Sequence, residues 1–73
     1  MDYIQLHQRK DYDEVRKLAL YRYFEPRYRK AGYSDKQIFQ FLDLNSESLQ
    51  RLHKKYETDQ DFREAVDLCQ KKY

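Results

Sequence analysis

The last part of the chain has the most regular spacing of apolar residues. Five of them recur at positions i, i+3, i+4, i+7 and i+11: Phe62, Ala65, Val66, Cys69 and Tyr73. This spacing puts all five on one face of an α-helix. The opposite face is polar: Arg63, Glu64, Asp67 and Lys71. Thr58 is suited to cap the start of such a helix, with Asp59 and Asp61 in its first turn. The pattern predicts an amphipathic final helix that closes the core.

Residues 34–56, SDKQIFQFLDLNSESLQRLHKKY, predict two short helices joined by a tight turn. The apolar residues form two pairs with one residue between them: Ile38 and Leu42, then Leu44, then Leu49 and Leu52. Spacings of four and three put each pair on one helix face, and Leu44 in the turn can fill the angle between the helices. This arrangement is a helix-turn-helix.

Capping residues mark the starts of both short helices. Ser34 with Gln37 fits a capping box for the first helix. Either Asn45 or Ser46 is suited to cap the second helix.

A longer helix is predicted to begin at Asp11, which with Glu14 resembles a capping box. Residues then follow helical spacing in two stripes: Val15, Leu18 and either Tyr21 or Arg22, and Leu20, Phe24 and Tyr28. Pro26 either kinks this helix or ends it near Phe24, because proline lacks a backbone donor and disfavours helical geometry in the preceding residue. Gly32 closes the segment. In residues 1–10, Ile4 and Leu6 alternate with polar residues, which suits a short extended or flexible arm; a helical turn is the alternative.

The central segment resembles the helix-turn-helix of homeodomain-like DNA-binding modules, such as those of resolvases, sigma-factor tails and small phage or mobile-element regulators. The residues that carry this resemblance are Gly32, Ser34, Ile38, Leu42, Leu44, Ser46, Leu49 and Leu52. They cover about a third of the chain. The tail ETDQDFREAVDLCQKKY is also similar to phage helix-turn-helix proteins, including the N-terminal domains of terminase small subunits. The resemblance implies a DNA-binding module that reads DNA with its second short helix.

Two residues depart from the family pattern. Phe39 stands where a small alanine is usual, at the closest contact between the two helices, so it is expected to push them apart or force repacking. Asp43 stands where a turn glycine is usual. Aspartate tolerates the left-handed backbone conformation better than most residues, so Asp43 is the milder departure.

Composition favours one small all-α domain over residues 1–73, a bundle of three to five helices that contains the helix-turn-helix. Only twelve residues are Ile, Leu or Val, so the eight tyrosines and four phenylalanines must supply much of the core. A single cysteine excludes an internal disulfide and fits a cytoplasmic protein. No apolar run approaches the length of a membrane span, and no signal peptide pattern is present.

The sequence gives no support for catalysis, a metal or a cofactor. His7 and His53 are far apart in the chain and have no evident carboxylate or cysteine partner. Cys69 lies on the apolar stripe of the final helix, where a small core residue is expected. Neither zinc-ligand spacing nor a glycine-rich phosphate loop occurs. We therefore expect a protein that is not an enzyme.

Double-stranded DNA is the first partner that the pattern indicates, with helix 45–56 in the major groove. Residues expected at base edges are Asn45, Ser46, Glu47, Gln50 and Arg51. Gln50 can pair with adenine, Arg51 with guanine, and Glu47 can accept from cytosine. Residues expected at phosphates are Lys54, Lys55, Lys36, Arg27, Arg29 and Lys30. A homodimer would let so small a domain read two half-sites.

The alternative is a protein-interaction module that keeps the helix-turn-helix shape, such as a phage-encoded inhibitor or adaptor. The net charge of only +2 favours it, as do Phe39, Asp43 and Glu47. Four tyrosines also lie among arginines: Tyr21, Tyr23, Tyr28 and Tyr33. Such aromatic residues can stack on bases or anchor a protein partner. Helical spacing favours burial of Tyr21 and Tyr28, and leaves the other two harder to bury.

Overall fold

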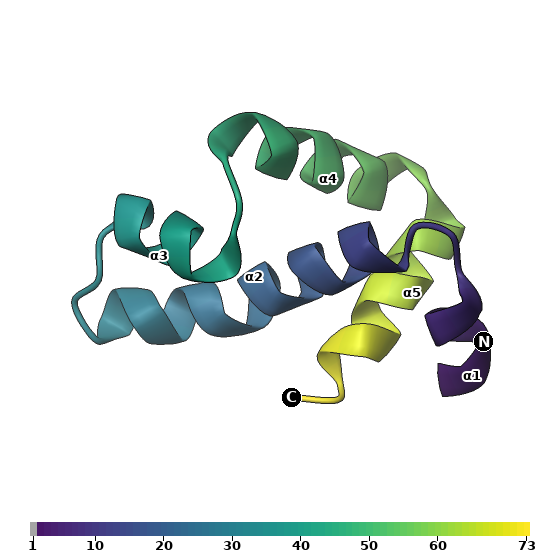
Figure 1. The fold of residues 1–73 in the computed structure, drawn as a ribbon. Helices are drawn as coiled ribbons and strands as arrows, with labels where there is room; N and C mark the ends of the chain where they lie inside the picture. Colours follow the sequence, from purple (N-terminus) through teal and green to yellow (C-terminus); the bar gives the residue numbers. More distant parts are fainter. Residues whose placement is uncertain (1) are drawn as a thin grey trace.

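Five α-helices make up most of the protein in a computed structural model that describes residues 2–73 (Figure 1). They are α1 (Tyr3–Gln8), α2 (Tyr12–Lys30), α3 (Asp35–Leu42), α4 (Ser46–Thr58) and α5 (Gln60–Gln70). These residues contain no β-strand. The prediction of a small all-α bundle is therefore confirmed.

No helix among residues 2–73 combines the length and apolar character that crossing a membrane requires.

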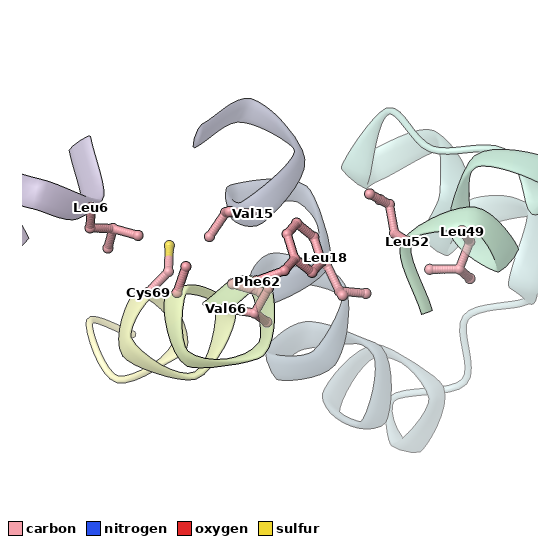
Figure 2. Packing of buried hydrophobic residues seen from close by; sticks show 10 residues of the cluster. Leu6, Val15, Leu18, Leu49, Leu52, Phe62, Val66 and Cys69 are labelled. Carbon is pink, nitrogen blue, oxygen red and sulfur yellow. The ribbon is translucent and has the colours of Figure 1, made fainter. Parts of the chain in front are cut away.

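The long helix α2 is the centre of the bundle, and every other helix packs against it (Figure 1). Helix α5 crosses α2, α4 packs on both, and α1 packs against α5 and the start of α2. The main core consists of Leu6, Val15, Leu18, Ala19, Leu49, Leu52, Phe62, Ala65, Val66 and Cys69. Figure 2 shows Phe62 in the middle of this core, beside Leu18. Thus four of the five helices contribute to one core, and α3 lies outside it along α2.

The predicted stripe of the final helix is confirmed in its first four members. Phe62, Ala65, Val66 and Cys69 are all fully buried. Tyr73 follows the end of α5 and is 39% exposed. The cap differs from the expectation: Asp59 is the N-cap, and its carboxylate accepts a hydrogen bond from the backbone N–H of Phe62 at 3.2 Å. Thr58 instead ends α4.

The first residues form a helix, so the helical alternative for this segment is the correct one over Tyr3–Gln8. Asp2 and Gln5 form a reciprocal capping box that starts α1. Leu6 is fully buried in the core, which fixes this short helix to the bundle. The predicted extended arm is therefore wrong for these residues, and Met1 lies outside the described residues.

Helix α2 runs without interruption through Pro26 to Lys30, so the prediction that it could end near Phe24 is wrong. The expected capping box at its start is also wrong. Asp11 is the N-cap but makes no side-chain capping bond. Its carboxylate instead accepts two hydrogen bonds from Arg9, at 2.7 and 3.0 Å. These bonds, with a smaller contribution from Lys55, hold the pKa of Asp11 below its ordinary value.

Helices α3 and α4 begin with the predicted caps. Ser34 and Gln37 form the capping box of α3, and the side chain of Asn45 accepts a hydrogen bond from the N–H of Ser48 at the start of α4. Asp43 ends α3 in the left-handed conformation, with φ 53° and ψ 50°. The expectation that aspartate serves in this turn in place of glycine is therefore confirmed.

Phe39 is half-buried and packs against the core. Its ring lies 6.2 Å from that of Tyr21 on α2. Leu44 is half-buried in the turn and packs against the core, as expected. An open hollow of about 640 Å³ remains between α3 and the start of α4, lined by Lys36, Phe39, Gln40, Asp43, Leu44, Asn45 and Ser46. With the bulky Phe39 at this position, the two helices pack mainly on other helices: α3 on α2, and α4 on α5 and α2.

Candidate nucleic-acid interface

Burial of one face of α4 determines which of its side chains face solvent. Leu49 and Leu52 are only 8% and 1% exposed. Gln50, Arg51 and Lys54 are exposed and share the opposite flank of the helix. The structure therefore brings together these three of the predicted site residues, in a position where a partner can reach them.

The N-terminal end of α4 offers fewer free groups than the sequence suggests. The side-chain oxygen of Asn45 accepts the capping bond from Ser48 at 2.7 Å, which leaves only its NH₂ group for a ligand. Ser46 and Glu47 are exposed. Lys36 lines the hollow beside Ser46, so it lies at the same end of α4 as the predicted base-reading residues.

Two cations of α4 are held by acids at the start of α2. Arg51 donates to Glu14 at 3.2 Å, and Lys55 lies 3.5 Å from Asp11 and 3.6 Å from Glu14. Lys55 is the less exposed of the two, since 34% of its side chain is accessible against 59% for Arg51. To contact nucleic acid, either cation would first have to exchange an internal carboxylate for a phosphate or base.

The remaining predicted phosphate contacts lie at the far end of α2. Arg27, Arg29 and Lys30 are in its last turn, whereas Lys55 contacts its first turn. From Glu14 to Arg27 the helix rises about 20 Å. Arg29 is itself paired with Glu25 and Asp35, whose hydrogen bonds raise its pKa. The structure therefore does not join these residues and Lys55 in one continuous positive strip.

A connected set of aromatic rings covers the C-terminal half of α2 and was only partly visible in the sequence. We call the aromatic path the six residues Tyr23, Phe24, Tyr28, Tyr33, Phe41 and Tyr73. Neighbouring ring centroids lie between 4.9 and 5.9 Å apart. Tyr33, Phe41 and Tyr73 are 42%, 55% and 39% exposed. The sequence pattern did not single out Phe41, and it placed Tyr73 in the apolar stripe of the final helix.

The other residues considered for chemistry or binding make contacts within the protein. Tyr21 is not part of the aromatic path. Its ring packs against those of Phe39 and His53, with centroid distances of 6.2 and 5.8 Å. Cys69 is a buried free thiol in the core. His7 stacks on Tyr12 at 4.7 Å. Nowhere between residues 2 and 73 do three or more His, Cys, Asp or Glu side chains gather in a way that could hold a metal ion.

Comparison of the chain with protein-family models, with curated proteins and with solved structures gives no match. The function is therefore argued from the geometry of the exposed groups.

Proposed function

We propose that this protein is a small helix-turn-helix DNA-binding protein that reads duplex DNA with α4. The observation that carries the proposal is the contrast between neighbours on this helix. Leu49 and Leu52 are buried, while Gln50 and Arg51 face solvent. Two anchored leucines hold the polar flank in a fixed orientation, and a fixed helix flank is what entry into a major groove requires.

The exposed groups match the donor and acceptor pattern of base edges. The amide of Gln50 can pair with adenine, and the guanidinium of Arg51 with the two acceptors of guanine. Glu47 can accept from the amino group of cytosine. Lys54 and Lys36 would contact the flanking phosphates, which add affinity but no sequence information.

The internal ion pairs of Arg51 and Lys55 are compatible with this role. The side chains of Arg51 and Glu14 are 59% and 36% exposed, and an exposed pair stabilises a protein by at most about 1 kcal/mol. Exchange of Glu14 for a phosphate therefore costs the protein little. A regulator of a phage or mobile element, acting in the cytoplasm as a dimer on two half-sites, is the role that suits so small a module.

A second candidate is a protein-interaction module, and one observation favours it. Three of the large exposed hydrophobic residues, Tyr33, Phe41 and Tyr73, belong to the aromatic path rather than lying scattered over the surface. Clustered exposed apolar groups mark interaction sites.

Electrophoretic retardation of mixed-sequence duplex DNA at two salt concentrations tests the first proposal. The protein should retard the duplex at low salt and lose affinity as salt rises. Arg51→Ala should weaken binding by about 1–3 kcal/mol, and Lys54→Ala should reduce the salt slope by about 0.9. Lys71→Ala alters an exposed lysine directly after α5; it is the matched control and should bind duplex like the wild type. Absence of retardation at low salt, or equal binding by all four proteins, would reject a DNA-reading role for α4.

A further inference from the structure

A second surface, separate from the flank of α4, combines positive charge with aromatic rings. A hollow of about 440 Å³ lies between α2 and α5. Its lining residues are Arg22, Tyr23, Arg27, Asp67, Gln70 and Lys71. Arg27 was expected from the sequence at DNA phosphates, but it lies in the last turn of α2, far from the residues of α4 now proposed to read duplex DNA.

The three cations of this hollow differ from those beside α4 because they have no internal acid. Among residues 2–73, the ion pairs involve Arg9, Lys17, Arg29, Arg51 and Lys55. Arg22, Arg27 and Lys71 are not within 4.0 Å of any described carboxylate. The one acid of the lining, Asp67, accepts a hydrogen bond from the hydroxyl of Tyr56 at 2.7 Å. The lining therefore carries a net charge of +2 and suits an anion.

Both arginines are held in place by aromatic rings. The guanidinium carbon of Arg22 lies 4.3 Å from the centroid of Tyr56, and that of Arg27 lies 3.7 Å from the centroid of Tyr23. Arg22 also donates to Gln70 at 3.3 Å. Arg27 also donates one hydrogen bond to the backbone carbonyl of Tyr23. The contacts with the rings restrain both guanidinium groups, and their remaining N–H groups can donate to an oxyanion.

The hollow opens onto the aromatic path at Tyr23, which belongs to both. From Tyr23 the rings continue to Tyr73 at 5.5 Å and to Phe24 at 4.9 Å. They pass through Tyr28 to the exposed rings of Phe41 and Tyr33. A cationic hollow that continues into a row of rings is the arrangement that binds single-stranded nucleic acid, since phosphates meet cations while bases stack on aromatic faces.

We propose that this surface binds single-stranded nucleic acid, with phosphates in the hollow between α2 and α5 and bases on the exposed rings of Tyr73, Phe41 and Tyr33. The charge of the hollow complements phosphates, and the open rings complement unpaired bases. An acidic peptide would satisfy the cations but would leave the rings without a planar partner. The site is independent of duplex reading by α4, so either activity can fail without the other.

Fluorescence anisotropy with labelled single strands of about ten nucleotides, a length within known site sizes, tests the proposal. The wild-type protein should bind the strand at low salt. Phe41→Ala removes an exposed ring and should weaken binding roughly five- to hundred-fold. Ile4→Ala removes an exposed apolar side chain from α1 and should bind like the wild type. Because the protein lacks tryptophan, quenching of tyrosine emission on binding gives a second signal that reports stacking.

The charge of the hollow is tested with a second pair of variants. Lys71→Ala should reduce the salt slope for single strands by about 0.7, whereas Lys54→Ala should leave it unchanged. Circular dichroism of all four variants should show wild-type helicity, because each altered side chain is exposed. Absence of single-strand binding at low salt, equal loss in Phe41→Ala and Ile4→Ala, or tighter binding of polyglutamate than of the strand would overturn the proposal. The last result would assign the surface to an acidic protein partner.

Discussion

Glu14 is the residue whose replacement tests most sharply how α4 is held and used. Its carboxylate lies 3.2 Å from Arg51 and 3.6 Å from Lys55. One of its oxygens, Oε2, is buried and has no hydrogen-bond partner. Glu14→Gln keeps the shape of the side chain and removes its charge. The substitution therefore releases Arg51 and leaves Lys55 with Asp11 as its remaining acid, without changing the shape of the side chain on α2.

The expected changes in stability and in binding have opposite signs. Loss of two partly exposed ion pairs should lower the free energy of unfolding by about 1 kcal/mol or less. Each cation released for a phosphate should steepen the dependence of log K on log salt by about 0.9. Between about 50 and 200 mM salt, the affinity of the variant for duplex DNA should then fall roughly 3- to 12-fold more than that of the wild type. At the lower salt concentration the variant should bind more tightly.

Anisotropy titrations of a labelled duplex over this salt range, with urea unfolding of the same proteins, measure both quantities. Glu64→Gln is the matched control, because it makes the same change of charge on the exposed face of α5. If Glu14→Gln and Glu64→Gln steepen the salt dependence equally, net charge alone explains the effect. If Glu14→Gln leaves duplex affinity unchanged, Arg51 and Lys55 do not face DNA and the reasoning is wrong.

Three further predictions concern the fold. Phe62→Ala should destabilise the protein by about 3–5 kcal/mol in urea unfolding, because the ring fills the centre of the core; a loss below about 1 kcal/mol would contradict this packing. Asp59→Ala should cost about 1 kcal/mol by removing the cap of α5, and an unchanged melting temperature would speak against that cap. Desolvation, followed by the neighbouring Cys69, raises the pKa of Tyr73 from 10.0 to about 12. Stability from this group should therefore be present below pH 10 and fall between about pH 10 and 12. Because the pKa values of Tyr21 and Tyr56 are also raised, Tyr73→Phe should make the decline shallower without abolishing it, and an identical decline in both proteins would refute the prediction.

The features that the sequence predicts correctly depend on short-range rules. Helical spacing identifies the buried residues of α5, and a serine followed three residues later by glutamine identifies the start of α3. Asp43 was expected in the left-handed turn because few other residues tolerate that conformation. Each rule involves neighbours along the chain, so no knowledge of the tertiary structure is needed.

Most of the features that the sequence does not predict depend on side-chain contacts outside the periodic pattern. The carboxylate of Asp11 was expected to cap α2, but it accepts hydrogen bonds from the neighbouring Arg9 and lies near the distant Lys55. The aromatic path brings Tyr73 onto Tyr23 across 50 positions, a contact that no periodic pattern contains. Helix α2 continues through Pro26 against its local preference, since α3 packs along the same helix and tertiary contacts outweigh propensity.

Mapping of backbone amide chemical shifts during titration with duplex DNA tests the central claim most directly. The account predicts that the largest changes follow α4 and the start of α3, from Lys36 through Ser46 to Lys54, and that the amides around Lys71 remain unaffected. A separate titration with a single strand should shift the amide resonances of Tyr23, Phe41 and Lys71 and leave those of α4 unaffected. Changes confined to the aromatic path with both ligands, and none along α4, would contradict the proposal that α4 reads DNA.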